Sequence, residues 1–230
     1  MKIIAFGDIH MSLGNFAQIP GIKTADLIIL TGDLTNLGGR SEAKEILNQV
    51  MTVNPRVFAQ LGNLDRPEVD TYLNELDINL HGQARLFQRQ VCLMGLGGSN
   101  LTPFKTPTEF TEEELSTSLN QAHEQARAFM DLSGSGKHRN PPLIFISHTP
   151  PLNTKTDQLD GGVHVGSTAV RHFIEKQQPA LCLCGHIHEA KGEDWIGKTH
   201  ILNPGMIHQQ GWIEIDIDSS HHGHVKAVLR

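Results

Sequence analysis

Seven side chains of the kinds that bind transition metals follow short apolar segments of the chain. They are Asp8, His10, Asp33, Asn63, His148, His186 and His188. Imidazole, carboxylate and amide groups together suit divalent transition metals rather than calcium. The set is larger than one tetrahedral ion needs, whereas two ions that share a bridging carboxylate use it naturally. Asp33 is the candidate for that bridge.

Each of these residues also has an ordinary structural role. Asp8 or Asp33 could cap a helix, Asn63 could lie in a turn, and a single histidine is more often a hydrogen-bonded core residue than a ligand. The joint pattern favours a metal site, because all of them follow strand-like segments. Glycine precedes Asp33, Asn63 and His186, and glycine suits tight turns that bring the backbone close to a bound group.

The segments that position these residues predict a layered α/β fold. Consecutive apolar residues, typical of strands buried on both faces of a sheet, occupy 2–6, 27–30, 56–61, 143–146 and 180–183. Helix-like segments alternate with them at 41–51, 67–75, 112–131 and 167–176. Thr111 followed by Glu114 predicts a capping box at the start of the third helix. Because the carboxyl ends of neighbouring parallel strands open onto one crevice, we expect the seven side chains to converge there.

Other segments break this alternation. Residues 85–95, 200–202, 212–218 and 225–229 have the pattern of strands joined by turns, which predicts a second and more antiparallel sheet. Residues 131–142 contain glycines and prolines between polar residues and predict a surface loop. His221, His222 and His224 predict an exposed hairpin rather than a metal site.

Length and composition limit the classes of protein. With 230 residues, 38% of them apolar, the chain can bury one substantial core, and we expect a single domain over 1–230. The net charge of −6 argues against duplex nucleic acid as a partner. No apolar run reaches the roughly 20 residues that span a bilayer and no signal peptide is evident, so we expect a cytoplasmic protein without membrane contact. Cys92, Cys182 and Cys184 lack metal or redox spacing and are predicted to be buried apolar residues.

The clusters that carry the candidate ligands resemble the motif set of the calcineurin-like metallophosphoesterases. They read Asp8-Ile9-His10, Gly32-Asp33, Gly62-Asn63-Leu64-Asp65, His148 and Gly185-His186-Ile187-His188, and Asn203-Pro204-Gly205 resembles the segment that follows the last motif in small bacterial and archaeal members. The resemblance implies a four-layer α-β-β-α sandwich of two mixed sheets with flanking helices and a metal site at the carboxyl ends of the strands. It also implies that one metal binds Asp8, His10, Asp33 and His188, and the other Asp33, Asn63, His148 and His186.

The sequence departs from the family pattern at Leu64. Much of the family has a histidine there that protonates the leaving group, and leucine cannot exchange a proton. The attack itself is less affected, because the expected nucleophile is a metal-bridging hydroxide. Three substitutes for the acid are open: a substrate that leaves as a stable anion, a metal-bound water, or another histidine. His164, in a glycine-containing segment after His148, is the first candidate and His208 the second, although either could be an ordinary exposed histidine.

Contacts with the substrate are harder to place from sequence. Asn63 is a candidate substrate-binding residue as well as a metal ligand. Arg66 could hydrogen-bond a phosphoryl oxygen with its planar guanidinium, but it precedes Pro67 at the start of a helix and could equally be a solvated flank.

The predicted function is a dinuclear metal-dependent phosphoesterase that cleaves a small phosphate ester, with a diester favoured. Its cofactors would be two divalent ions, with Mn, Fe and Zn all compatible with the ligands. The alternatives are a phosphomonoesterase or nuclease of the same superfamily, or a non-catalytic scaffold on the same fold such as the retromer subunit. A nuclease would favour a basic track with aromatic platforms, and the chain has only 9 Phe, 2 Trp and 1 Tyr. A homo-oligomer is possible, but the sequence does not indicate one.

Overall fold

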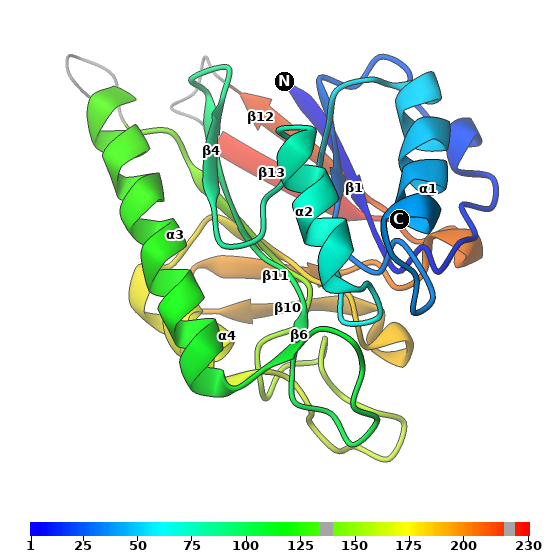
Figure 1. The fold of residues 1–230 in the computed structure, drawn as a ribbon. Coiled ribbons are helices and arrows are strands. Elements are labelled where there is room, and N and C mark those ends of the chain that lie inside the picture. The colour runs from blue at the N-terminus through cyan, green and yellow to red at the C-terminus, as the bar shows by residue number, and fades with distance from the viewer. Residues whose placement is uncertain (134–139, 219–223) are drawn as a thin grey trace.

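A computed structural model describes residues 1–133, 140–218 and 224–230 (Figure 1). His221, His222 and the central part of the predicted 131–142 loop lie outside the described residues. Within the described part, the chain forms two large mixed sheets and four α-helices. Figure 1 shows α1 and α3 on opposite sides of the molecule with the sheets between them.

The first sheet has the strand order β13-β12-β1-β2-β3. Its parallel strands are β1 (Lys2–Phe6), β2 (Leu27–Leu30) and β3 (Val57–Ala59), with Ile3 paired to Leu27 and Ile28 paired to Val57. The antiparallel strands are β12 (Ile213–Asp218) and β13 (His224–Leu229).

The second sheet has the order β10-β11-β9-β8-β5-β4. Its central strands, all parallel, are β5 (Val91–Leu96), β8 (Leu143–Ser147), β9 (Leu181–Leu183) and β11 (Thr199–Asn203). The edge strands β4 (Ala84–Phe87) and β10 (Gly192–Ile196) are antiparallel to their neighbours. Two short strands, β6 (Ser99–Asn100) and β7 (Glu109–Phe110), form a separate parallel pair.

The helices cover the outer faces of the two sheets. They are α1 (Arg40–Val53), α2 (Pro67–Glu75), α3 (Glu112–Ser133) and α4 (Thr168–Gln177), with 3-10 turns η1 (Phe16–Gln18), η2 (His188–Ala190) and η3 (Ile207–Gln209). One apolar cluster joins α1 and α2 to the first sheet, and another joins α3 and α4 to the second. A third cluster lies between the sheets. The predicted four-layer α-β-β-α sandwich is therefore confirmed.

Strand β1 shows why the central strands are apolar at every position. Ile3 and Ala5 point into the core between the sheets, while Ile4 and Phe6 belong to the core beneath α1 and α2. Side chains of a strand alternate between the two faces of its sheet, so a strand covered on both faces needs apolar residues throughout.

The two sheets are mixed, as the resemblance implies, but the prediction that residues 85–95, 200–202, 212–218 and 225–229 together form a second and more antiparallel sheet is wrong. The five strands that precede the candidate ligands divide between the sheets, with β1, β2 and β3 in the first and β8 and β9 in the second. The segments predicted at 212–218 and 225–229 extend the first sheet beside β1. The predicted strand at 56–61 is also shorter than expected, because only Val57–Ala59 pairs as β3.

Local predictions at a helix start and at the cysteines are confirmed. The backbone N–H of Thr111 donates to Glu114 Oε2 at 2.8 Å, and the N–H of Glu114 donates back to Thr111 Oγ1 at 3.2 Å, which is a capping box. Cys92, Cys182 and Cys184 are free and buried. Among the described residues, none of the helices is both long and apolar enough to cross a membrane.

Candidate metal centre

The seven candidate ligands lie just beyond the carboxyl ends of five strands and meet in one place. Residues after β1, β2 and β3 come from the first sheet, and residues after β8 and β9 come from the second. One group of potential ligand atoms lies within 4.8 Å of one another; it consists of Asp8, His10, Asp33 and His188. Within it, His10 Nε2 is 3.0 Å from His188 Nε2, and His188 Nε2 is 3.4 Å from Asp8 Oδ1.

A second group forms around the amide of Asn63. Its Oδ1 atom lies 3.1 Å from His148 Nε2 and 2.8 Å from His186 Nδ1. The backbone N–H of His186 donates to Asp8 Oδ1 at 3.1 Å, so the two groups touch. Asn63, His148 and His186 thus offer three potential metal ligands in one place, and one carboxylate oxygen would complete a set of four.

Asp33 supplies an oxygen to both groups. Its Oδ2 atom lies 3.8 Å from His10 Nε2 and 3.4 Å from His148 Nε2. Its other oxygen, Oδ1, accepts the backbone N–H of Leu64 at 2.8 Å, which fixes the orientation of the carboxylate. The sequence singled out Asp33 as the bridge, and the structure places it between the two groups.

Several of the candidate ligands have a backbone conformation that L-residues seldom adopt. The φ angles of Asp8, His10, Asp33 and His186 are 47°, 47°, 51° and 68°. Non-glycine residues in the left-handed region cost on the order of 1–3 kcal/mol each and persist where the surrounding structure imposes them. Such strain concentrates at functional sites, and here it aims side chains from sharp turns after the strands into a common space.

Two of the glycines in the clusters are required by close packing against the ligands. A Cβ atom on Gly185 would lie 2.5 Å from Asp8 Oδ2, and one on Gly32 would lie 2.5 Å from His148 Nδ1. Gly32 also has a φ of 123°, which favours glycine. The backbone at these turns therefore lies close to the side chains of candidate ligands, while its predicted approach to a bound group stays a prediction.

The charges of the site set the protonation states of the candidate ligands in the metal-free protein, and for two of them, Asp33 and His186, these are the states that metal binding needs. Burial would raise the pKa of Asp33, but the neighbouring His148 and His10 outweigh it and lower that pKa to about 2. Burial lowers the pKa of His186 to about 4. Asp33 is therefore ionised and His186 neutral at pH 7, as ligation requires. For His148, burial is outweighed by Asp33, which raises the pKa to about 9, so metal binding would displace a proton there.

A family model described as calcineurin-like phosphoesterase matches residues 1–190 and thus includes all of the candidate ligands. The chain belongs to the calcineurin-like phosphoesterase family.

The chain is also similar to proteins of several organisms and shares its fold with solved structures. An uncharacterised protein of Methanocaldococcus jannaschii is 33% identical over 212 residues, covering 89% of this chain and 88% of that protein. A probable glycerophosphodiester phosphodiesterase of Arcobacter nitrofigilis is 26% identical over 196 residues, which cover 82% of this chain and 66% of that protein. The fold matches that of a Thermus thermophilus protein, with a TM-score of 0.65, 18% identity and coverage of 99% and 97%. It also matches a dimetal phosphatase of Danio rerio, with a TM-score of 0.62, 12% identity and coverage of 100% and 98%.

The donor set of this calcineurin-like phosphoesterase fits divalent transition metals. Imidazole nitrogens and carboxylate oxygens suit Mn, Fe and Zn. Metal-binding histidines commonly have their second ring nitrogen hydrogen-bonded, which leaves the first free for the ion. His148 Nδ1 lies 3.2 Å from the backbone oxygen of Thr31, and His10 Nδ1 lies 3.1 Å from Asn36 Oδ1. In both residues Nε2 therefore faces the metal side.

Sequence reasoning missed the residues that orient the ligands. Asn63 Nδ2 donates to Thr106 Oγ1 at 3.0 Å, from a loop more than 40 residues away in sequence. Asn36 and Thr31 were also not anticipated. A single threonine or asparagine in a loop has no pattern that distinguishes it from a solvated residue, so no signal in the sequence could have identified these contacts.

Asp65, the acidic residue of the Gly62–Asp65 cluster, has a different role from the candidate ligands. Asp65 is buried and accepts the backbone N–H groups of Leu34, Thr35 and Gly62 at 2.8–3.0 Å. Burial, followed by the nearby charge of Asp33, raises its pKa to about 7. Asp65 thus fastens the turn after β2 to the turn after β3 and holds two ligand-bearing segments together.

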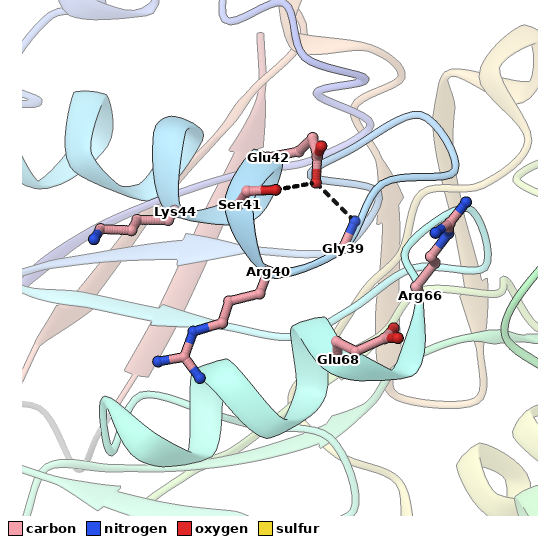
Figure 2. A pocket seen from close by; sticks show the side chains of 7 residues that line it. All are labelled: Gly39, Arg40, Ser41, Glu42, Lys44, Arg66 and Glu68. Carbon is pink, nitrogen blue, oxygen red and sulfur yellow. Dashed lines mark hydrogen bonds between the residues drawn. The ribbon is translucent and has the colours of Figure 1, made fainter.

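Arg66 lies outside the ligand cluster. It is exposed, immediately precedes α2, and lines a pocket of about 520 Å³ between the starts of α1 and α2. None of the candidate metal ligands lines this pocket. Figure 2 shows the side chains of Arg66 and Arg40 pointing in different directions, so the two guanidinium groups do not converge on one point. Contact between Arg66 and a substrate stays a prediction.

The two histidines considered as substitutes for an acid occupy different settings. His164 lies in the loop before α4, where its Nδ1 is 2.7 Å from Asp157 Oδ1. His208 is exposed in η3. Across the described residues, no hydrogen bond or ion pair links either one directly to the candidate metal ligands. Leu64 is half-buried, and its backbone rather than its side chain serves the site.

Proposed function

We propose that this calcineurin-like phosphoesterase hydrolyses a phosphate ester, with a diester preferred, by means of two divalent metal ions. The observation that carries the proposal is the position of Asp33 Oδ2, 3.8 Å from His10 Nε2 in one ligand group and 3.4 Å from His148 Nε2 in the other. A carboxylate between two histidine-containing groups is the arrangement that a bridging ligand of a two-metal hydrolase requires.

Each ion would have its own protein ligands. The first would be held by Asp8, His10, Asp33 and His188, and the second by Asp33, Asn63, His148 and His186. When bound, the two ions would lower the pKa of a shared water and neutralise charge on the phosphoryl oxygens. Mn, Fe and Zn are all compatible with these ligands.

The chain's own residues set the charge and the geometry of the site. Asp33 is held by the Leu64 N–H, and the Asn63 amide is held by Thr106, so neither ligand has to reorganise when a substrate arrives. The Leu64 side chain cannot supply a proton. Substrates with stable leaving anions are therefore expected to react without further help, and poorer leaving groups need a proton from elsewhere.

Several observations support a small diester as substrate. A diester carries less negative charge than a monoester, and the chain has a net charge of −6. The relative from Arcobacter nitrofigilis is named as a probable glycerophosphodiester phosphodiesterase. The same net charge is unfavourable for duplex nucleic acid, which we do not propose as a partner. We place the protein in the cytoplasm, without membrane contact.

The test is hydrolysis by metal-stripped protein reloaded with Mn²⁺. Bis(p-nitrophenyl) phosphate is a suitable diester because its leaving group needs no acid, and p-nitrophenyl phosphate is the matching monoester. We expect metal-dependent turnover, faster for the diester, and loss of that turnover in D33N, which lacks the carboxylate proposed to be shared by the two ions.

Faster turnover of the monoester would contradict the diester preference. Two bound ions without hydrolysis of either ester would contradict the enzymatic proposal and favour a non-catalytic scaffold, in line with the leucine at position 64.

A further inference from the structure

A buried carboxylate organises the loop that carries His164. Asp157 is fully buried, and its Oδ2 accepts the backbone N–H groups of Asn153 at 3.1 Å and Gly166 at 2.9 Å. Its Oδ1 accepts the N–H of Thr154 at 2.8 Å and lies 2.7 Å from His164 Nδ1. An ionised carboxylate only accepts hydrogen bonds, so Nδ1 of His164 must carry a proton and Nε2 is directed away from Asp157.

One end of this loop is fastened to the turn that contains His186. The side-chain amide of Asn203, at the end of β11, is buried. Its Nδ2 lies within hydrogen-bond distance of the backbone oxygens of Thr156, Gly185 and Ile187, at 3.3, 3.4 and 2.9 Å. Thr156 directly precedes Asp157, and Gly185 and Ile187 flank His186. The base of the Asp157 loop therefore adjoins a candidate metal ligand.

The other end is fastened near His148. Asn100 Nδ2 donates to the backbone oxygen of Val165 at 3.1 Å, and Asn100 Oδ1 accepts the hydroxyl of Thr149 at 2.7 Å. Val165 follows His164, and Thr149 follows His148. Figure 1 shows the corresponding segments, around β6 and before α4, gathered at the same end of the molecule. His164 thus lies in a loop clamped on both sides to residues adjacent to metal ligands.

We propose that His164 is the catalytic acid of this site and that Asp157 is its positioning residue, an inference that rests on the proposed phosphoesterase function. As water oxygen forms a bond to phosphorus, the bond from phosphorus to the leaving oxygen breaks and its electron pair stays on that oxygen. The imidazolium of His164 donates its Nε2 proton to the leaving oxygen and becomes neutral. The proton lost by the attacking water passes to solvent, from which His164 is reprotonated. The Asp157 carboxylate, 2.7 Å from Nδ1, fixes the orientation of the ring.

Three features favour this role for His164. Its side chain is 31% exposed, so a leaving group can reach it, while its partner Asp157 is fully buried. The carboxylate holds the ring by Nδ1, and within the part of the chain that the structure describes no hydrogen bond is made to Nε2, as a proton donor needs. His208, by contrast, is exposed without a hydrogen-bonded carboxylate among the described residues.

The test compares diesters that differ only in how much they need an acid. A series of aryl methyl phosphates, from p-nitrophenyl to phenyl, is hydrolysed by the Mn²⁺-loaded wild type and by H164N. We expect H164N to act on the p-nitrophenyl ester within about 3-fold of the wild type and to lose about 10²-fold or more on the phenyl ester. H208N and H172N, which alter exposed histidines on η3 and α4, should follow the wild type over the whole series.

The outcomes separate this inference from the function on which it rests. If the wild type hydrolyses no ester in the series, the phosphoesterase proposal fails and the acid assignment falls with it. If the wild type is active and H164N loses no more on the phenyl ester than on the p-nitrophenyl ester, only the assignment of His164 is overturned. A selective loss in H208N would assign the acid to His208 instead.

A readout independent of catalysis tests Asp157. In metal-free protein, the ¹⁵N shifts of the neutral His164 ring should show the proton on Nδ1. D157N replaces one acceptor oxygen with an amide and should shift the proton towards Nε2, and it should reproduce the selective loss on the phenyl ester. A neutral wild-type ring protonated on Nε2 would overturn the pairing. D157N also removes hydrogen bonds from a buried turn and can disturb its folding. The ¹⁵N shifts of the wild type and the rates of H164N test the proposal independently of that variant.

Discussion

The orientation of the candidate ligand Asn63 depends on a residue outside the five clusters. Its Nδ2 donates to Thr106 Oγ1, and that hydroxyl donates in turn to Glu109 Oε1 at 2.7 Å. The amide nitrogen is therefore held towards the loop, and Oδ1 is held towards His148 and His186. Removing such a supporting contact typically weakens metal binding by about 10- to 100-fold.

T106V removes the acceptor for Asn63 Nδ2 while keeping the shape of the side chain. We expect a 10- to 100-fold weaker affinity for the Mn²⁺ ion that Asn63 would help to hold, measured by competition with a chelator. T117V is the matched control, because the exposed Thr117 hydroxyl bonds the backbone oxygen of Glu113 within α3. Equal affinities in T106V and the wild type would show that Thr106 does not orient the ligand.

The setting of His81 predicts a pH dependence of stability. Its Nδ1 accepts the backbone N–H of Gly97 at 2.9 Å, and its ring stacks on Phe110 at a centroid distance of 5.5 Å. Burial lowers the pKa of His81 below 6.5 and outweighs the opposing charge of Asp70. The unfolded chain therefore binds a proton at a higher pH than the folded chain, and stability falls as the pH drops below about 6.5.

H81Q should reduce this dependence. In metal-free protein, we expect the loss of unfolding free energy between pH 7.5 and pH 5.5 to be smaller in H81Q than in the wild type, measured by urea denaturation. H172Q, which alters an exposed histidine on α4, should match the wild type. The same loss in H81Q as in the wild type would rule out His81 as a source of the pH dependence.

At this scale the sequence predicted the side chains with metal chemistry but not their supports. Candidate ligands such as Asp33 and His186 follow a glycine at a strand end, and that local pattern can be read along the chain. Thr106, Asn36 and Asp157 act through contacts with residues far away in sequence or within an irregular loop, and such contacts depend on the finished fold.

At the scale of elements, α3 stabilises the start of α4. Glu112, in the first turn of α3, accepts the hydroxyl of Ser167 at 2.7 Å and the backbone N–H groups of Thr168 and Ala169 at 3.1 and 2.8 Å. The first N–H groups of a helix lack partners within the helix, and a negative charge near them is favourable. This contact fixes the end of the loop that carries His164.

E112A should therefore destabilise the protein. Hydrogen bonds to a charged group contribute about 1.5–3 kcal/mol, and we expect a loss of that size in the free energy of unfolding, measured with denaturant. The neighbouring exposed residue Glu113 provides the control, because E113A should change the free energy of unfolding by less than about 0.5 kcal/mol. Similar effects of the two substitutions would contradict the capping role of Glu112.

Helices and strands with a local sequence pattern were predictable, but the strands with which each strand pairs were not. The capping box at Thr111 and the apolar segments marked helices and strands correctly. The segment at 212–218 alternates apolar and polar residues, which predicts a strand but does not determine which sheet it joins. It pairs with β1, from the other end of the chain, and only the packing of the whole molecule determines that pairing.

At the scale of the whole molecule, the candidate metal centre joins the two sheets. Asp8, His10, Asp33 and Asn63 follow strands of the first sheet, whereas His148, His186 and His188 follow strands of the second. Each proposed ion would have ligands from both sheets. Metal binding is therefore expected to stabilise the sandwich as well as to serve catalysis.

This link predicts a metal-dependent stability. For each independent site, Mn²⁺ at 100 times its dissociation constant should add about 2.7 kcal/mol to the free energy of unfolding. Calcium at the same concentration should add much less, because the imidazole-rich set does not suit it. The measurement is denaturant unfolding with each metal and with a chelator, and identical curves in Mn²⁺ and chelator would contradict the link between the sheets.

The central claim is that one carboxylate, Asp33, joins two metal sites. The most direct measurement is electron paramagnetic resonance of the Mn²⁺-loaded protein together with its metal content. Ions that share a bridging ligand at roughly 3.5–4 Å should be magnetically coupled. We predict two ions per chain with a coupled spectrum in the wild type, and loss of the coupling in D33N. One ion per chain, or two ions with the spectrum of isolated Mn²⁺, would contradict the account.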